Sequence, residues 1–284
     1  MMSPQEIVQL MQNELSGIYD SNEISAMARE MMTKVLHCQP VDIVMHYNEE
    51  LPDTFTNILL EMIGRLKNYE PLQYILRVAH FHGHDFSVSP AVLIPRPETA
   101  QLVDMIVDEN TGSDLTVLDI GTGSGCIAIS LARALKFAQV TGIDVSASAL
   151  EVANQNAQML NTRVKFVEQD ILTCKAPYEA WNIIVSNPPY VTESEKAEME
   201  RNVLDYEPHE ALFVPDNDPM LYYRPIAAYA SRALKPGGRL YLEINRAMGQ
   251  QVSEILMSCG LRNIQIHTDY YGNSRFVTAT KENN

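Results

Sequence analysis

The segment Asn187-Pro188-Pro189-Tyr190 carries polar and aromatic groups directly after the apolar run 181–186. Two consecutive prolines remove two backbone donors and hold the chain extended, so nearby carbonyl groups cannot relax into a ladder or a helix. The side-chain carbonyl of Asn187 and the main-chain carbonyl of Pro188 are therefore suited to accept one hydrogen bond each from an amide or amino nitrogen. Such acceptors orient the nitrogen lone pair and stabilise the positive charge that develops when it attacks an electrophile. Tyr190 offers an aromatic face for stacking; a plain strand-ending turn with a packed tyrosine is the alternative.

A second group of residues points to a bound cofactor. Glycines alternate in the pattern D-x-G-x-G-x-G, after one apolar segment and before another. Glycine allows tight turns and close approach to a ligand because no Cβ intervenes. The predicted cofactor loop consists of Asp119, Gly121, Thr122, Gly123, Ser124 and Gly125. Its spacing differs from the dinucleotide fingerprint, and no Walker lysine follows it, which disfavours a triphosphate.

Two further aspartates follow the next two predicted strands. Asp144 comes about 20 residues after the glycine loop, where a carboxylate accepts hydrogen bonds from ribose hydroxyls in open α/β sheets. Asp170 is predicted to accept from an adenine amino group, with the backbone N–H of Ile171 on the ring. Either aspartate alone would be an ordinary cap or loop residue. Together with the glycine loop they predict a nucleoside site at the carboxyl edge of a sheet.

The elements that position these residues alternate between strand and helix. Strands are predicted at residues 115–121, 138–146, 163–172, 181–189 and 239–244. Helices are predicted between them at residues 124–135, 147–160 and 220–234, with a turn at 235–238. This alternation is typical of a parallel sheet with helices on both faces, an α/β fold.

The chain before this region has a different texture. Apolar residues at helical spacing predict helices within 3–19, 21–36 and 51–69, the first capped by Ser3 and the second by Ser21 or Asn22. From Pro71 the chain is rich in β-branched and aromatic residues, which predicts a hairpin. A regular strand there would place the histidines on one face; they are His80, His82 and His84. No carboxylate or cysteine cluster adjoins them, so we predict a solvated or packed hairpin and no metal.

The glycine loop with its two aspartates resembles the class I S-adenosylmethionine-dependent methyltransferases, and this resemblance selects S-adenosylmethionine over NAD. The Asn-Pro-Pro-Tyr segment is similar to that of enzymes methylating adenine, cytosine or protein glutamine. More specifically, "PLQYILRVAHFHGHDFSVSPAVLIPRPET", "YEPHEALF", "LKPGGRLYLEI" and "DYYGNSRFV" resemble the HemK-type N(5)-glutamine methyltransferases of peptide chain release factors. The resemblance runs from about Pro71 to the C-terminus.

The resemblance implies a seven-stranded Rossmann-like sheet, a small N-terminal helical domain and a β-hairpin linker. The implied boundaries are 1–72 for a substrate-binding domain, 73–95 for the linker and 96–284 for the methyltransferase domain. The implied target is the glutamine of the release-factor Gly-Gly-Gln loop. Carried over by position, Gly121 to Gly125 and Asp144 bind the cofactor, and Asn187 to Tyr190 hold the glutamine, with Asn187 also near the cofactor. The same resemblance places Arg96, Pro97 and Glu98 along the site.

The sequence departs from the family pattern in a few places. Arg77 and Ala100 stand where Gly and Glu are expected, and Asn245 follows "LEI" where Gly is usual. The segment 214–220 replaces one that contains glycine. These positions bear on the hairpin, the linker and the rim, and so on substrate docking more than on catalysis.

Composition limits the alternatives. The net charge of −15 disfavours a nucleic-acid partner, because binding to phosphates relies on Lys and Arg. An N(6)-adenine DNA methyltransferase is thus a weaker alternative than a glutamine methyltransferase of a ribosomal protein, and a non-catalytic partner subunit would have lost the glycine loop or Asn187. Four scattered cysteines indicate reduced thiols, and no apolar run approaches the roughly 18 residues of a membrane span. We expect a cytoplasmic, monomeric enzyme with no direct nucleic-acid contact.

Overall fold

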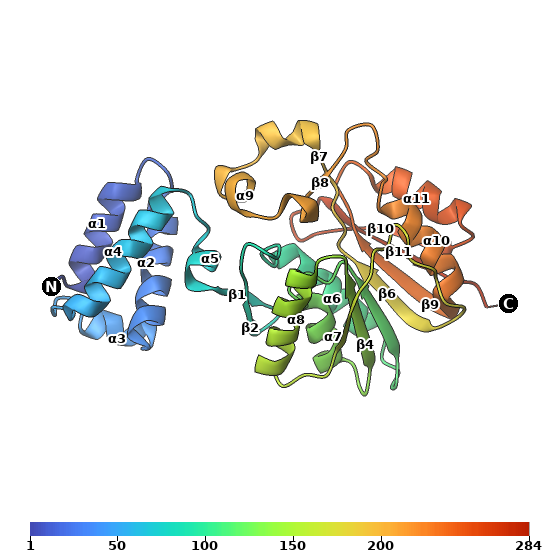
Figure 1. The fold of residues 1–284 in the computed structure, drawn as a ribbon, viewed down its shortest axis with the longest axis horizontal. Helices are drawn as coiled ribbons and strands as arrows, with labels where there is room; N and C mark the ends of the chain where they lie inside the picture. Colours follow the sequence, from blue (N-terminus) through green and yellow to red (C-terminus); the bar gives the residue numbers. More distant parts are fainter. Residues whose placement is uncertain (284) are drawn as a thin grey trace. The chain divides into compact units, whose positions relative to one another are not determined.

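The computed structural model describes residues 1–283, which form two compact units. The first comprises Met1–Arg77 together with Glu200–Tyr206, and the second comprises Val78–Met199 together with the chain from Glu207 onward. Each unit has its own core. The chain is coloured along its length in Figure 1.

The first unit is entirely helical; the sequence predicted α1, α2 and α4, but not α3, α5 or α9. Its helices are α1 (Pro4–Leu15), α2 (Ser21–Leu36), α3 (Pro40–Met45), α4 (Asp53–Lys67), α5 (Leu72–Leu76) and α9 (Arg201–Tyr206). Ser3 and Glu6 form the predicted capping box at the start of α1. The predicted cap of α2, Ser21 or Asn22, was wrong, because the N-cap is Asp20. The Asp20 carboxylate accepts hydrogen bonds from the backbone N–H groups of Asn22 and Glu23.

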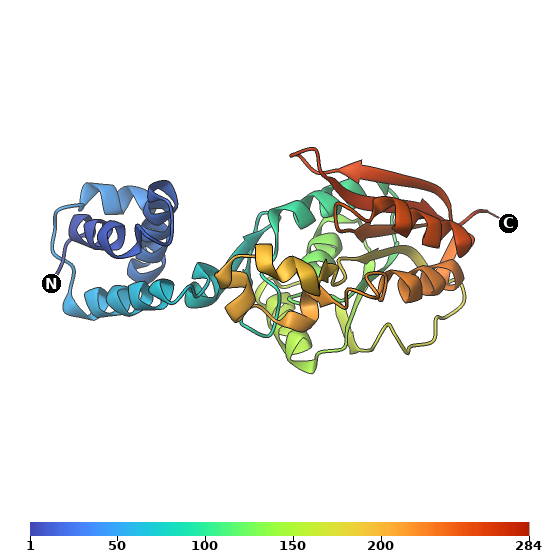
Figure 2. The same cartoon turned by 90° about the horizontal axis from the view of Figure 1, so that it is seen from above.

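The apolar stripes of these helices meet in a small core. Helices α1, α2 and α4 pack on one another, and their fully buried residues are Ile7, Met11, Leu15, Ile24, Ala28, Met31, Leu59 and Leu66. The spacing of three and four residues along each helix is what brings them to one side. Figures 1 and 2 show these helices as the blue part of the chain.

The hairpin is shorter than predicted. Strands β1 (Val78–Phe81) and β2 (His84–Ser87) pair antiparallel, and residues 72–76 before them are the helix α5. His82 and Gly83 form the turn, both with positive φ, so the three histidines do not lie on one strand face. Arg77 ends α5 in the left-handed region (φ 57°), which explains why a glycine suits this position.

A seven-stranded sheet forms the centre of the second unit, as predicted. Its strands are β3 (Thr116–Ile120), β4 (Gln139–Asp144), β5 (Lys165–Glu168), β6 (Trp181–Ser186), β9 (Leu234–Glu243), β10 (Arg262–Thr268) and β11 (Ser274–Thr280). The strand order is β10-β11-β9-β6-β3-β4-β5. The strands from β9 to β5 run parallel, and β11 is antiparallel to β9 and β10. Residues 235–238, predicted as a turn, belong to β9 and pair irregularly with β6.

Helices cover both faces of this sheet. They are α6 (Pro97–Glu109), α7 (Cys126–Ala134), α8 (Ala147–Met159), α10 (Tyr223–Ala233) and α11 (Gly249–Ser258). One buried cluster joins the sheet to α6 and α7, and another joins it to α10 and α11. The green helices α6 to α8 and the orange-red pair α10 and α11 are visible in Figures 1 and 2. Successive side chains of a strand point to opposite faces of the sheet. Because helices cover both faces, the side chains on both faces are apolar.

Short elements follow β6. They are β7 (Val191–Thr192), the 3₁₀ helices η1 (Glu193–Glu198) and η2 (His209–Ala211), and β8 (Phe213–Val214), which pairs with β7. All four cysteines are free, as predicted. Within residues 1–283, no helix is both long and apolar enough to cross a membrane.

Candidate functional site

A cavity of about 290 Å³ opens at the carboxyl edge of the parallel strands. This is where ligands bind in open α/β sheets. Its walls come from the loops after β3, β4, β5 and β6, from the segment before α6, and from η2 and α10. The lining residues with predicted roles are Arg96, Gly121, Thr122, Gly123, Ser124, Asp144, Asp170, Ile171, Asn187, Pro188 and Pro189.

The glycines of the loop have two different functions. Gly121 and Gly123 have positive φ, and a Cβ on either would meet no atom of the protein within 4 Å. Their bare backbone therefore leaves room for a ligand to approach. Gly125 has φ +78° and caps α7, but its missing Cβ would lie 3.1 Å from Ala153 and Phe166. Gly125 does not line the cavity; its function is close packing.

Asp119 also lies behind the cavity wall. Its Oδ2 accepts a hydrogen bond from Thr122 Oγ1 at 2.6 Å, and the side chain has no exposed surface. Burial raises the pKa of Asp119 to about 7, partly opposed by the Thr122 hydrogen bond. The structure thus places Asp119 as a support for the loop rather than at the cavity surface.

Asp144 and Asp170, by contrast, reach the cavity. Asp144 Oδ2 accepts from Gly123 N at 2.9 Å, and its Oδ1 accepts from Ser146 N at 2.9 Å. Carboxylate oxygens have further lone pairs, so Asp144 can still accept from a ligand hydroxyl. Asp170 Oδ1 accepts from Leu172 N at 2.8 Å, which turns the loop and presents Ile171 and Leu172 to the cavity.

Asn187 follows directly from β6, whose last residue, Ser186, donates to Ile120 O at 2.8 Å. Asn187 Nδ2 donates to Thr99 Oγ1 at 3.2 Å, and Thr99 Oγ1 donates to Glu243 Oε2 at 2.7 Å. Asn187 Oδ1 and Pro188 O accept no hydrogen bond from any residue between 1 and 283. Two acceptors therefore remain free on residues that line the cavity.

Tyr190 is not brought to the cavity wall. Its hydroxyl donates to Glu243 Oε1 at 3.1 Å, and its ring packs against the apolar cluster of α10 and β9. Burial and the nearby Glu243 raise the pKa of the Tyr190 hydroxyl, which stays protonated as a donor. Tyr190 is partly buried and packs on this cluster, and it does not line the cavity.

Of the two predicted site residues at the start of α6, Arg96 lines the cavity and Glu98 does not. Arg96 lines the cavity and forms an ion pair with Glu207, with Nη2 to Oε1 at 2.6 Å. Glu207 Oε2 also accepts from Ile94 N at 3.1 Å, so the Glu207 side chain joins "IPRPET" to "YEPHEALF". Glu98 is half-buried in the first turn of α6 and does not line the cavity.

Sequence reasoning missed several residues that shape this site. Thr99 and Glu243 hold Asn187, Glu207 holds Arg96, and the exposed Val145 and Leu172 give the mouth an apolar character. Only their position within or next to the quoted motifs could have indicated them.

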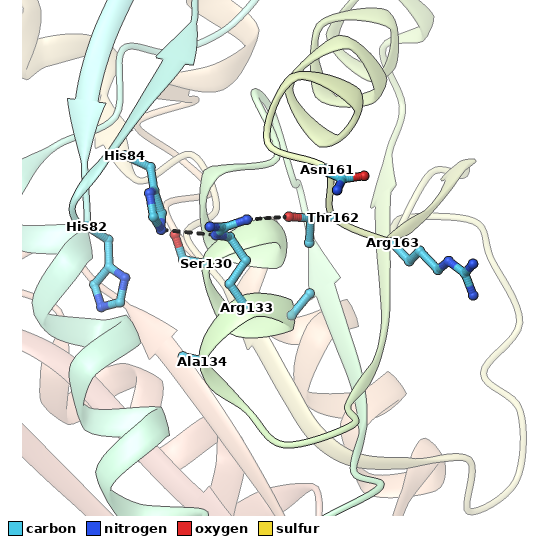
Figure 3. Close-up of a pocket in the computed structure, with 9 residues that line it drawn as sticks. His82, His84, Ser130, Arg133, Ala134, Asn161, Thr162 and Arg163 are labelled. Atoms are coloured by element: carbon cyan, nitrogen blue, oxygen red, sulfur yellow. Dashed lines mark hydrogen bonds between the residues drawn. The ribbon is translucent and has the colours of Figure 1, made fainter.

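His82 and His84 line a separate polar hollow, whereas His80 contacts Asp85 Oδ1 at 3.0 Å. His84 Nε2 accepts from Arg133 Nε at 3.0 Å, and His82 Nε2 contacts Asp104 Oδ1 at 3.0 Å. Figure 3 shows His84 and Arg133 facing each other, whereas Arg163 points away. Among residues 1–283, no three possible metal ligands converge.

The residues that line the carboxyl-edge cavity fit S-adenosylmethionine. Open space at Gly121 and Gly123 admits the ligand to the backbone, and Asp144 provides carboxylate acceptors for hydroxyl groups. Val145, Ile171 and Leu172 provide an apolar boundary for a flat ring.

Comparisons with known proteins identify the family of the chain. Residues 111–276 match the family described as a methyltransferase domain, and residues 6–76 match the PrmC N-terminal domain. A release factor glutamine methyltransferase of Bacteroides thetaiotaomicron is 44% identical, covering 97% of this chain and 99% of its own. Another, of Flavobacterium psychrophilum, is 42% identical, covering 93% of this chain and 94% of its own.

A solved methyltransferase of Pyrococcus furiosus shares the fold. It has a TM-score of 0.52 and 18% identity, and covers 70% of this chain and 90% of its own. The extent and identity of the sequence matches are decisive: the chain belongs to the family of release factor glutamine methyltransferases.

Proposed function

We propose that this protein uses S-adenosylmethionine to methylate the side-chain amide nitrogen of the glutamine in the Gly-Gly-Gln loop of peptide chain release factors. The observation that carries the chemistry is the pair of free acceptors, Asn187 Oδ1 and Pro188 O, on the wall of a cavity that fits the cofactor. Membership of the family supports the choice of substrate.

When bound, S-adenosylmethionine supplies an electrophilic methyl group on a sulfonium. The glutamine amide nitrogen is a weak nucleophile because its lone pair is delocalised into the carbonyl. Asn187 Oδ1 and Pro188 O each accept one of its two hydrogens, which fixes the direction of the nitrogen lone pair. The same two oxygens stabilise the positive charge on nitrogen as the nitrogen–carbon bond forms and the carbon–sulfur bond breaks.

The proton that the nitrogen then releases can leave to water. No general base is required, because a methylated, positively charged amide is a strong acid. Pro189 helps to keep the two acceptors in place by restricting the backbone after Pro188. Arg96, held by Glu207, and the η2 segment form the wall beside these acceptors, where the substrate loop would enter.

The remaining assignments belong to the same proposal. Residues 1–72 would recognise the release factor, residues 73–95 would act as a linker and residues 96–284 would carry out the transfer. Gly121, Gly123, Asp144 and Asp170 would contact the cofactor. We propose that the enzyme acts as a monomer in the cytoplasm, where translation termination takes place.

Labelled cofactor tests this proposal directly. The protein is incubated with release factors, with release factors whose Gly-Gly-Gln glutamine is replaced by glutamate, with ribosomal proteins and with duplex DNA. We expect label on the intact release factor alone. Label on ribosomal proteins or DNA, or none on the release factor, would refute the proposed substrate.

The role of Asn187 is tested in the same assay. Asn187→Ala should lower kcat by roughly 100-fold or more, because it removes an acceptor that acts in the transition state. The dissociation constant of the cofactor, measured by calorimetry, should change little. His84→Ala, in the separate polar hollow, is the matched control and should leave both quantities unchanged.

A further inference from the structure

Glu243 is a buried carboxylate that the transfer reaction does not use directly. It is the last residue of β9, and it is 1% exposed. Burial raises the pKa of its carboxyl group, so its position is unfavourable for the charged form. A carboxyl group buried in such a place needs specific hydrogen-bond partners.

Its partners come from three motifs that are distant in the sequence. Oε2 accepts from Thr99 Oγ1 at 2.7 Å, and Oε1 accepts from Tyr190 O–H at 3.1 Å. Arg275, in the closing segment "DYYGNSRFV", lies near Glu243 and is itself held by Asp269 Oδ2 at 3.3 Å. Glu243 therefore brings "IPRPET", "NPPY" and "DYYGNSRFV" together.

The direction of these hydrogen bonds determines the orientation of the Asn187 amide. The Thr99 hydroxyl hydrogen is used on the Glu243 carboxylate, so Thr99 Oγ1 can only accept from Asn187. Asn187 must then turn Nδ2 toward Thr99. If the amide were flipped, Asn187 Oδ1 would face Thr99 Oγ1. No hydrogen bond could then form between the two oxygens, because the Thr99 hydroxyl hydrogen is already donated to Glu243.

We propose that Glu243 and Thr99 are positioning residues: through them, Asn187 is held with its carbonyl oxygen toward the cavity, ready to accept from the substrate amide. Tyr190 anchors the other end of the same segment on the same carboxylate. The carbonyl of Pro188, between the two anchored residues, is thereby held as well. This inference rests on the proposed function, since it assigns the geometry of that site.

Thr99→Val removes the hydroxyl while keeping the shape of the side chain. We expect kcat to fall roughly 10- to 100-fold, the effect of a misplaced group in the site. The KM and the dissociation constant of the cofactor should stay within about threefold of the wild type, since Thr99 acts through Asn187. Thr99→Ser restores the hydroxyl and should recover most of the activity, and Glu243→Gln should lower kcat as well.

A control on the same strand separates positioning from stability. Tyr241, two residues before Glu243, donates its hydroxyl to Glu109 Oε2 at 2.8 Å and lies away from the cavity. Tyr241→Phe also loses a buried hydrogen bond, yet its kcat should equal that of the wild type. If Tyr241→Phe slows the enzyme as much as Thr99→Val, or if Thr99→Val keeps wild-type kcat, the inference is wrong.

A measurement on the free protein keeps this test independent of the substrate. In the wild type, the side-chain amide protons of Asn187 should be protected from exchange in ¹⁵N NMR spectra, and Thr99→Val should remove this protection. Absence of transfer by the wild type would refute the proposed function alone. Unchanged Asn187 amide signals in Thr99→Val would overturn the inference, whatever the substrate.

Discussion

Replacing Asp119 by asparagine should change how the stability of the second unit depends on pH. The folded protein raises the pKa of this carboxyl group from 3.8 to about 7, chiefly through burial. Between these values the unfolded chain has released the proton while the folded chain still holds it. The unfolded state thus binds fewer protons, and stability must fall as pH rises from about 4 to about 7. At about 1.4 kcal/mol per pKa unit, the loss amounts to about 4 kcal/mol.

Asparagine keeps an oxygen that can accept from Thr122 but carries no titrating proton. The variant should therefore lack this loss, and its stability relative to wild type should improve by up to about 4 kcal/mol between pH 4 and pH 8. Urea unfolding, followed by the fluorescence of Trp181 in β6, measures this difference without cofactor. Other titrating groups cancel in the comparison. A difference between the two proteins that stays constant across this range would refute the reasoning.

Three further substitutions test local packing and hydrogen bonding. Gly142→Ala should destabilise the protein by ~1–3 kcal/mol in urea and weaken cofactor binding, because a Cβ there would lie 2.7 Å from Thr122 Oγ1. Gly64→Ala, at an exposed position of α4 with open space around a Cβ, should instead stabilise the protein by ~0.5–1 kcal/mol. If both substitutions changed the stability equally, the packing argument would be wrong. Asn245→Gly removes hydrogen bonds to Glu195 at 3.1 and 3.2 Å, so hydrogen exchange should rise in η1 but not in β6; unchanged η1 exchange would count against it.

The sequence predicted the sheet, and it indicated which segments would lie at its carboxyl edge, because both depend on local patterns. Alternation of strand and helix brings successive strand ends to one edge, which places Gly121, Asp144 and Asn187 around one cavity. Glycine and proline also act locally, through φ and through missing donors. No knowledge of distant contacts was needed for these features.

Side-chain direction could not be predicted in the same way. The ring of Tyr190 was expected at the cavity, but its hydroxyl binds Glu243, which lies 53 residues later in the chain. Asp119 was predicted to bind the cofactor together with the loop that it supports. Residue spacing alone does not show that its carboxyl group is buried. Arg77 was noticed as an unusual residue, yet only its φ of 57° shows that the position favours glycine.

The two most buried carboxylates of the site share a physical pattern. Asp119 and Glu243 are each located at a strand end, each has its pKa raised by burial, and each accepts from a threonine hydroxyl. Thr122 belongs to the cofactor loop, and Thr99 holds the substrate-facing Asn187. Burial of a carboxylate reduces stability, but it also fixes the threonine that depends on it. Stability is thus lower at the two points where the reaction requires fixed geometry. Asp119→Asn and Glu243→Gln should both change how stability depends on pH, because each removes a carboxyl group whose pKa is raised by burial. They should separate in kcat, because only Glu243 acts on Asn187 through Thr99.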